Sequence, residues 1–343
     1  MRKVSIAIGA GILAVLGVSI ATAQDRLPRE CRREIRQLCG TDRDEIRNCL
    51  REKAGSLSEH CRTQLRERIG ARRDTPADGK RARTGTGQEI AYGAAPLQKA
   101  DFWPGRGEQA PLVLFVHGGG WKRGDKNMMD GSPMLSHWQE AGYAVASANY
   151  RLVPDATVEQ QAADVASAFA WFRSHAGELG IDPERIVLIG HSAGAHLVAL
   201  VGTDPQYLAA KGLSLSDIAG VIPNDGAAYD VPSQMGENAV VLGDTYEQAF
   251  GTDPERQKAL SPTRHAAAPN APQFLLIHVQ RQDGIRQAKG LEAALKATGT
   301  SVERHEFEGR GLQGHAEINR KLGDPAYPAT AVVDAWLKRV FAR

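Results

Sequence analysis

The chain has 343 residues, of which 42% are hydrophobic and 24% are charged, and its formal net charge at neutral pH is +2. This length is enough for one large domain and a small additional module. The nearly balanced charge gives little information about partners. We expect a small-molecule substrate and no nucleic-acid partner.

The N-terminus has the pattern of an export signal. Residues 1–3 are Met-Arg-Lys, the run Val4–Ile20 is apolar, and Ala-Thr-Ala follows at residues 21–23. A charged head, a short apolar core and a small-x-small end predict a signal peptide over residues 1–23, cleaved after Ala23. The alternative is an uncleaved membrane anchor, although the apolar run is near the lower limit for spanning. No later segment is apolar enough to cross a bilayer, so we expect a periplasmic or secreted protein with no membrane span after cleavage.

All the cysteines lie within residues 24–70, which we interpret as a small helical module. Export favours disulfides, and an even number fits two bridges. Zinc is the alternative, but the spacing lacks the close C-x-x-C pairs that zinc sites favour. Three pairings are open, and one of them, Cys31 with Cys61 and Cys39 with Cys49, would staple a helical hairpin.

Short helices are expected in this module at Arg29–Leu38, Asp44–Lys53 and Ser58–Ile69, with Ser58 as an N-cap. So small a module buries too little apolar surface to fold unaided, and the two disulfides would supply the missing stability. Its many arginines alternate with acidic residues, which favours a solvated helical surface over a face that binds polyanions or the cell envelope. Residues 71–86 are polar and rich in small residues, and we interpret them as a flexible linker.

The spacing Cys31…Leu38-Cys39…Asn48-Cys49-Leu50…Leu57-Ser58…Cys61 resembles the cysteine-rich repeat of the Golgi apparatus protein family, which also occurs in exported bacterial proteins. The resemblance covers about forty residues and implies no catalysis. It leaves open a contact with the envelope or with another protein through this module.

From residue 87 to the end, apolar strand-like runs alternate with helical patterns, which predicts a parallel sheet covered on both faces. The expected strands are Glu89–Tyr92, Gln98–Trp103, Leu112–Val116, Ala144–Ala148, Ile186–Ile189, Gly220–Ile222, Phe274–Val279 and Val302–Phe307. The expected helices are Val158–His175, Ala193–Val201, Arg286–Thr298 and Thr330–Phe341. Chemistry in such sheets takes place at the carboxyl ends of the strands.

The segment Gly190-His191-Ser192-Ala193-Gly194 follows an expected strand and opens an expected helix. In this strand–turn–helix setting, the G-x-S-x-G pattern predicts a nucleophilic serine thrust out at the turn. The backbone N–H of Ala193 would point at the same place, at the positive end of the helix. The pattern alone also fits any tight turn, so the prediction depends on partners elsewhere in the chain.

A glycine-rich loop, His117-Gly118-Gly119-Gly120-Trp121, follows another expected strand. Consecutive glycines reduce stability, so they indicate backbone amides that must approach something closely. We predict that Gly119, Gly120 and Ala193 form an oxyanion hole, and that His117 organises the loop. The alternative is a plain glycine turn.

The general base is expected in a loop after the last strand, where an imidazole could reach Ser192. Of the ten histidines, only His315 lies in such a loop, while most of the others fall in helical or strand patterns. His191 is expected to face away from the site. For the acid we choose Asp283, which follows the penultimate strand. The rival is Asp225, but Asn-Asp-Gly is turn chemistry, so we assign Asp225 to a turn.

With the chain order Ser192, Asp283, His315, residues 87–343 resemble an α/β-hydrolase. The motifs 117–121, 149–152, 182–185 and 190–197 are similar to those of carboxylesterases related to hormone-sensitive lipase and kynurenine formamidase. Gly284-Ile285 stands after the predicted acid in place of the Pro-Leu usual in hormone-sensitive lipase relatives, which favours the formamidase and feruloyl-esterase-like branch.

The sequence therefore predicts an exported serine carboxylesterase acting on small to medium esters through an acyl-enzyme, without cofactor or metal. The alternatives are an amidase or arylformamidase with the same triad, or a non-catalytic binding protein with a hydrolase fold. The segments Lys122–Pro133 and Tyr229–Arg264 are expected to roof the site. Trp121 with Met128, Met129 and Met134 would line an apolar pocket there, or the methionines would be plain packing.

Overall fold

The computed structural model describes residues 29–39, 56–63, 87–238 and 244–342. The chain divides into two units, residues 1–81 and 82–343, and each is described by itself. The predicted signal peptide, residues 1–23, and the predicted linker, residues 71–86, lie outside the described residues. Every helix within the described ranges is too short or too polar to cross a lipid bilayer.

In the first unit, helix α1 (Arg29–Cys39) is joined to the helical residues 59–63 by a disulfide between Cys31 and Cys61. Both cysteines are buried with Ile35 and Leu57. This confirms one of the predicted pairs. Cys39 is also disulfide-bonded, but the predicted pair Cys39–Cys49 and the predicted helix at residues 44–53 reach outside the described residues.

Ser58 caps the second helical segment of this unit as predicted. The Ser58 hydroxyl accepts a hydrogen bond from the backbone N–H of Cys61 at 3.4 Å. The same hydroxyl and the backbone N–H of Ser58 donate to the carboxylate of Glu34 on α1. The two helical segments are thus linked by a polar contact as well as by the disulfide.

The second unit contains an eight-stranded sheet with the order β1-β2-β4-β3-β5-β6-β7-β8. The pairs β1–β2 and β2–β4 are antiparallel, and all the others are parallel. The strands are β1 (Gln88–Ala91), β2 (Lys99–Trp103), β3 (Ala110–Val116), β4 (Ala144–Ala148), β5 (Ile181–His191), β6 (Gly220–Asn224), β7 (Gln273–Val279) and β8 (Ser301–Phe307). All eight correspond to predicted strands, and β5 begins five residues earlier than expected.

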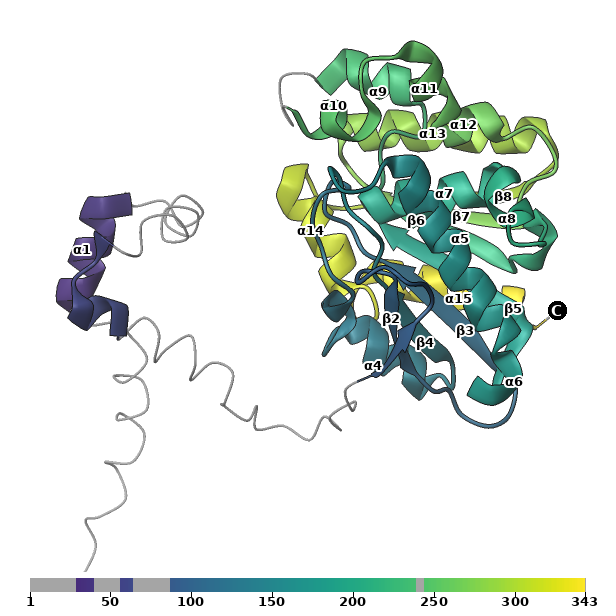
Figure 1. Ribbon diagram of the computed structural model, residues 1–343, viewed down its shortest axis with the longest axis horizontal. Coiled ribbons are helices and arrows are strands. Elements are labelled where there is room, and N and C mark those ends of the chain that lie inside the picture. Colours follow the sequence, from purple (N-terminus) through teal and green to yellow (C-terminus); the bar gives the residue numbers. More distant parts are fainter. Residues whose placement is uncertain (1–28, 40–55, 64–86, 239–243, 343) are drawn as a thin grey trace, which may run out of the picture. The chain divides into compact units, whose positions relative to one another are not determined.

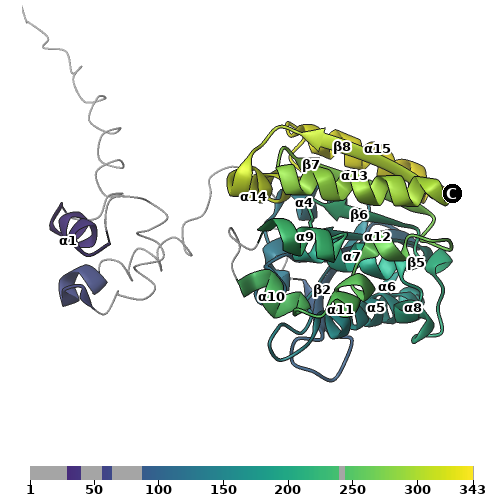
Figure 2. The same cartoon turned by 90° about the horizontal axis from the view of Figure 1, so that it is seen from above.

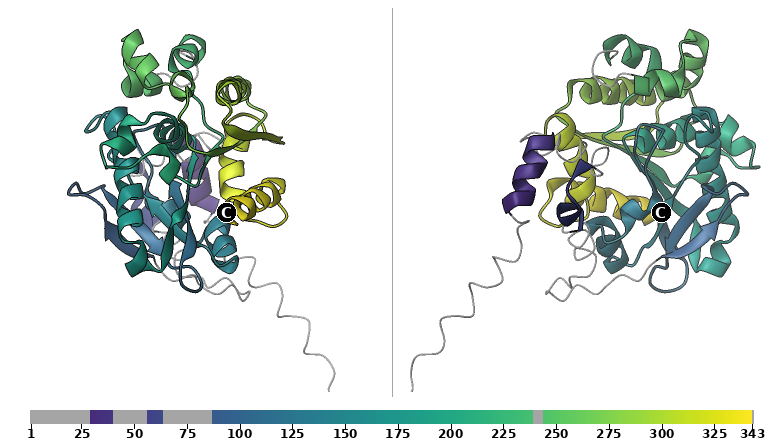
Figure 3. Two further views of the ribbon diagram at one scale, coloured as in Figure 1. Left: turned by 90° about the vertical axis from the view of Figure 1, so that its right-hand side faces the viewer. Right: turned by 60° about the vertical axis from the view of Figure 1, so that its left-hand side comes forward.

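Helices cover both faces of this sheet (Figure 3). They are α4 (Pro133–Glu140), α5 (Val158–Ser174), α6 (Ala176–Leu179), α7 (Ala193–Thr203), α8 (Gln206–Ala209), α13 (Gln282–Ala297), α14 (Gly311–Lys321) and α15 (Pro328–Phe341), with short 3₁₀ turns η2 (Lys126–Met129) and η3 (Leu215–Asp217). Alternation along β3 shows the two cores: Leu112 and Leu114 are buried with α5 and α7, whereas Val113 and Phe115 are buried with α4 and α15. The fold is that of an α/β-hydrolase, as predicted.

A group of four short helices follows β6 and lies beyond the carboxyl ends of the strands (Figures 1 and 2). These helices are α9 (Val231–Asn238), α10 (Asp244–Phe250), α11 (Pro254–Ala259) and α12 (Pro262–His265). We call residues 231–265 the cap segment. It corresponds to the segment predicted to roof the site, apart from residues 239–243, which are not described.

Candidate active site

Ser192 occupies a sharp turn between β5 and α7. Its backbone has φ 56° and ψ −117°, a left-handed conformation that a residue with a side chain rarely adopts. Close packing explains the flanking glycines, because a Cβ at Gly190 would lie 2.2 Å from the Gly194 carbonyl oxygen, and one at Gly194 would lie 2.2 Å from that of Val116. The turn therefore requires the predicted G-x-S-x-G pattern, and it exposes the serine at the carboxyl end of β5.

His315 contacts Ser192 directly. Its Nε2 lies 3.0 Å from Ser192 Oγ, which is hydrogen-bond distance. The pairing agrees with the prediction, but the setting does not: His315 belongs to helix α14 and not to a loop. Helix α14 begins at Gly311 directly after a short turn that follows β8, so a helical side chain near its start still reaches the ends of the central strands.

The carboxylate bound to His315 is Asp225. Asp225 Oδ2 lies 2.6 Å from His315 Nδ1, and Asp225 Oδ1 accepts a hydrogen bond from the backbone N–H of Val279 at 3.1 Å. Asp225 directly follows β6, where its φ is 47°. Asn-Asp-Gly therefore forms a turn, as predicted, but the same turn also presents the carboxylate to His315.

The predicted placement of Asp283 against His315 is wrong. Helix α13 begins at Gln282, four residues before the predicted start, so Asp283 lies in the first helical turn. Its Oδ1 is 3.7 Å from Arg281 Nε. The earlier start of α13 explains the difference, because Asp283 then lies on this helix with its carboxylate near Arg281. Asp225, at the end of β6, is the carboxylate that contacts His315.

The environment of Asp225 keeps its carboxylate charged. Complete burial by itself would raise the pKa of Asp225, but the hydrogen bond with His315 and the positive charge of Arg281 outweigh this effect, so the pKa lies below its ordinary value. An ionised carboxylate only accepts hydrogen bonds, so His315 carries its proton on Nδ1. His315 Nε2 is then free to accept the hydroxyl proton of Ser192.

His191 lies beside His315 and does not face away from the site as expected. The ring centroids are 4.5 Å apart, and His191 Nε2–H donates to the backbone carbonyl of His315 at 2.9 Å. Burial lowers the pKa of His191 to about 3, so this ring is neutral at ordinary pH. His191 therefore holds the backbone of His315 in place without adding a charge to the site.

The glycine-rich loop passes directly against the serine turn. A Cβ at Gly118 would lie 3.0 Å from Ser192 Cβ, and Gly119 has a φ of 133°. Substitution of Gly119 would also place a Cβ 2.0 Å from the Arg123 carbonyl oxygen. The loop adjoining Ser192 thus contains Gly119 and Gly120, and Ala193 is the first residue of α7. These are the residues predicted as oxyanion donors.

His117 and Trp121 fix the two ends of this loop. The buried ring of His117 stacks on Tyr150 at 4.3 Å, and the Tyr150 hydroxyl donates to the His117 carbonyl at 2.9 Å. The Trp121 carbonyl accepts from Gln161 Nε2 at 2.7 Å and from the backbone N–H of Val153 at 3.1 Å. His117 therefore organises the loop, as its position in the sequence indicated.

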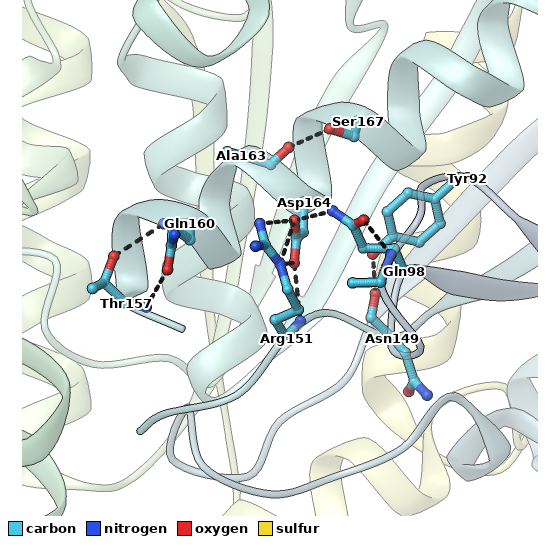
Figure 4. Close-up of polar contacts among 10 residues, drawn as sticks. Tyr92, Gln98, Asn149, Arg151, Thr157, Gln160, Ala163, Asp164 and Ser167 are labelled. Atoms are coloured by element: carbon cyan, nitrogen blue, oxygen red, sulfur yellow. Dashed lines mark hydrogen bonds and ion pairs between the residues drawn. The ribbon is translucent and has the colours of Figure 1, made fainter. Parts of the chain in front are cut away.

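A polar network holds the segment on both sides of Tyr150 (Figure 4). Asp164 on α5 accepts hydrogen bonds from the Arg151 guanidinium, the shortest at 2.7 and 2.9 Å, and one from Gln98 at 2.7 Å. The Tyr92 hydroxyl donates to the Asn149 carbonyl. Residues 149–152, a motif noted in the sequence, are thus fixed in place, and Tyr150 links them to the loop through His117.

The cap segment covers the other side of the loop. The ring of Trp121 packs against Phe250 and Tyr246 of α10, at centroid distances of 4.8 and 5.6 Å. The predicted methionine pocket is wrong for Met129 and Met134, which are fully buried in the core on the opposite face of the sheet from Trp121. Met128 is 43% exposed. The alternative of plain packing is therefore correct for two of the three.

Within the described residues, no group of three or more histidine, cysteine, aspartate or glutamate side chains is arranged to hold a metal ion. The chemistry that this arrangement can perform is proton transfer between Ser192 and His315, with Asp225 fixing the imidazole. A serine alkoxide formed in this way would attack an electrophilic carbonyl placed next to the glycine-rich loop.

The sheet order and the hydrogen-bonded serine, histidine and aspartate define this unit as an α/β-hydrolase. A family model described as BD-FAE matches residues 102–295, more than half of the chain, and the chain belongs to this family.

The chain is similar to two curated proteins of Mycobacterium tuberculosis. It is 30% identical to "Esterase LipC" over 231 residues, which are 62% of this chain and 56% of the relative. It is 29% identical to "Probable carboxylic ester hydrolase LipM" over 198 residues, which are 54% of this chain and 45% of the relative. The chain thus spans about half the length of the curated relatives it matches.

Among solved structures, esterase B from Lactobacillus Rhamnosis superposes with a TM-score of 0.61 at 22% identity, covering 82% of this chain and 91% of that one. The apo form of Thermogutta terrifontis esterase 2 superposes with a TM-score of 0.61 at 24% identity, covering 75% and 96%. At these identities the two structures show that the fold is shared.

Proposed function

We propose that this protein is an exported serine carboxylesterase that hydrolyses small to medium carboxylic esters. The observation that carries the proposal is the continuous hydrogen-bonded chain from Ser192 through His315 to Asp225, built on the turn between β5 and α7. The names of the curated relatives support ester hydrolysis. The N-terminal pattern of residues 1–23 supports export.

In the first half of the reaction, His315 Nε2 takes the hydroxyl proton as Ser192 Oγ attacks the ester carbonyl. The backbone N–H groups of Gly119, Gly120 and Ala193 hold the negative oxygen of the tetrahedral intermediate. His315 then passes its proton to the departing alcohol oxygen, which leaves an acyl group on Ser192.

In the second half, His315 Nε2 takes a proton from water, whose oxygen attacks the acyl carbonyl. A second tetrahedral intermediate collapses, the proton returns to Ser192 Oγ, and the carboxylic acid leaves. Throughout, Asp225 holds the Nδ1–H of His315 and stabilises the imidazolium that forms in each half. Neither half requires a change in oxidation state or a co-reactant other than water.

The test is hydrolysis of p-nitrophenyl acetate, butyrate and octanoate by the full chain and by Ser192→Ala. We expect the parent to hydrolyse the shorter esters and the variant to lose activity by several orders of magnitude. A fluorophosphonate should label the parent on Ser192 and leave the variant unlabelled, as shown by intact mass.

A phenyl formamide is assayed in parallel. Turnover of the formamide alone would show that the enzyme is an amidase and would contradict the esterase proposal. Equal ester hydrolysis by the parent and by Ser192→Ala would contradict the assignment of the nucleophile.

A further inference from the structure

A cation lies against the carboxylate of the Ser192–His315–Asp225 chain. Arg281 is the residue before α13, and its Nε is 3.6 Å from Asp225 Oδ2, the atom that also faces His315. Its Nη2 lies 3.4 Å from the Gly226 carbonyl oxygen, to which it donates. Only 11% of the Arg281 side chain is exposed. The guanidinium is therefore held inside the protein, next to the site and not in bulk solvent.

The backbone around Arg281 is shaped for this contact. A Cβ at Gly284 would lie 3.3 Å from Arg281 Nη2 and 3.6 Å from Asp225 Oδ1. A side chain at this position would sit tightly against the guanidinium and in van der Waals contact with the carboxylate. The first turn of α13 also supplies Asp283, whose Oδ1 is 3.7 Å from Arg281 Nε. Arg281 thus stands between two carboxylates, one in the hydrogen-bonded chain and one outside it.

Assuming the proposed esterase mechanism, we propose that Arg281 is a positioning residue that fixes the Asp225 carboxylate and extends the working range of the site to lower pH. The first effect follows from geometry. The Asp225 carboxylate is held by His315 and by the backbone N–H of Val279. Arg281 adds an electrostatic attraction to the same carboxylate and a hydrogen bond to the carbonyl of the following residue, Gly226.

The second effect follows from charge. When His315 takes a proton it becomes a cation that shares Asp225 Oδ2 with the guanidinium. Two cations at one carboxylate oxygen disfavour each other, so Arg281 disfavours the imidazolium and preserves the neutral form that can accept the serine proton. Asp283 offsets part of this effect because its carboxylate also lies close to Arg281 Nε. Burial shields the pair from solvent, so the interaction is stronger than a surface contact.

Other titratable groups lie near this site on the neighbouring elements. They are His191 on β5, Tyr229 after β6, Tyr246 on α10, His278 on β7, Asp283 on α13 and Tyr327 before α15. On α14, Glu317 pairs with Lys321.

Burial moves the pKa values of three of these rings far from neutral pH. It lowers the pKa of His191 to about 3 and raises those of Tyr246 and Tyr327 to about 12. Burial also lowers the pKa of His278 and raises that of Tyr229. His191, Tyr246 and Tyr327 therefore do not titrate between about pH 5 and about pH 9, the range over which activity is compared.

The experiment compares kcat/KM for p-nitrophenyl acetate as a function of pH in the parent, Arg281→Gln and Arg281→Lys. In Arg281→Gln we expect the low-pH limb to move to higher pH by roughly one unit and kcat to fall about tenfold with little change in KM. Arg281→Lys keeps the charge and should restore the limb, with partial recovery of kcat. The control is Lys289→Gln, which removes an exposed positive charge from the same helix and should leave the profile unchanged.

An unchanged low-pH limb in a folded Arg281→Gln protein would overturn the proposal. If that variant does not fold, Arg281→Met decides the question, because it also removes the charge while keeping an unbranched apolar stem in the buried position, and it should move the limb to higher pH in the same way. No movement, or movement to lower pH, would overturn the proposal. Folding is checked by the midpoint of thermal unfolding.

Failure of the esterase proposal is distinguishable from failure of this one. If the parent hydrolyses no ester, the same variants are compared through the pH titration of the His315 ring resonances by NMR, which needs no substrate. A lower midpoint in the parent than in Arg281→Gln then supports the role of Arg281, and equal midpoints refute it.

Discussion

Asp225→Asn tests the most consequential feature of the site, the carboxylate paired with His315. In the parent, one oxygen of Asp225 faces the Nδ1–H of His315 and the other accepts the backbone N–H of Val279. An asparagine has a single acceptor oxygen, so in either orientation its NH₂ group faces one of these donors. If the NH₂ group turns toward His315, the imidazole must carry its proton on Nε2 and can no longer accept the serine proton.

The expected loss in kcat/KM for Asp225→Asn is about 10³- to 10⁴-fold, which corresponds to about 4 to 5.5 kcal/mol of transition-state stabilisation. The measurement is hydrolysis of p-nitrophenyl acetate at about pH 8, where the neutral imidazole predominates in an unperturbed histidine. Asp283→Asn is the matched control, since it removes a carboxylate close to the same site, and it should stay within about threefold of the parent. A loss of more than about 100-fold in Asp283→Asn, with Asp225→Asn nearly as active as the parent, would refute the reasoning.

Two further predictions concern stability. Burial lowers the pKa of His191 to about 3 and that of His196 to about 4. Between these folded-state pKa values and the unfolded value of about 6.5, the unfolded chain binds more protons than the folded protein, so the free energy of unfolding falls as the pH decreases. The loss at pH 5 is about 2 kcal/mol for each ring. Urea unfolding at pH 7 and pH 5 measures this loss. It should be smaller by about 2 kcal/mol in His196→Leu and unaltered in the control His305→Leu, whose side chain is 40% exposed. An equal loss in the parent and in both variants would contradict this prediction. Gly194→Ala should prevent folding or destabilise the protein by more than about 3 kcal/mol, because the added Cβ would lie 2.2 Å from the Val116 carbonyl oxygen. Gly290→Ala on α13 should instead stabilise the protein by about 0.5 to 1 kcal/mol, because a Cβ there meets nothing within 4 Å. Thermal unfolding checks both, and a folded Gly194→Ala protein of parental stability would show that the turn has room to adjust.

The sequence was sufficient for features that depend on neighbouring residues along the chain. The inner strands β3, β4, β5, β6 and β7 contain short buried apolar runs, and such runs can be recognised from the residues alone. The turn at Ser192 joins a strand to a helix that is contiguous with it, so the serine, its flanking glycines and Ala193 were placed by local pattern. His315 was found by its position after the last strand, although the helix that carries it was not.

The sequence was not sufficient where the outcome depended on which elements lie side by side. Asp225 and Asp283 both follow strands, and the choice between them depends on which carboxylate the fold brings to His315 on α14 and on α13 beginning at Gln282. His191 was expected to face away from the site because side chains alternate along β5. This alternation gives no information about α14, the helix whose His315 contacts His191 at the end of β5. A signal for Asp225 was present, a carboxylate directly after an apolar strand, but its turn-forming neighbours favoured the structural interpretation.

By itself, then, the sequence determined the α/β-hydrolase fold, the serine turn, the histidine and the glycine-rich loop, because each is encoded in a contiguous stretch. The tertiary structure alone decided that His315 pairs with Asp225, that His191 supports His315, and that Arg281 lies against the carboxylate. These contacts join residues 56 to 124 positions apart. The contacts form because parallel strands bring their carboxyl ends to one edge of the sheet. A local sequence pattern does not show which residues, far apart in the chain, become neighbours at that edge.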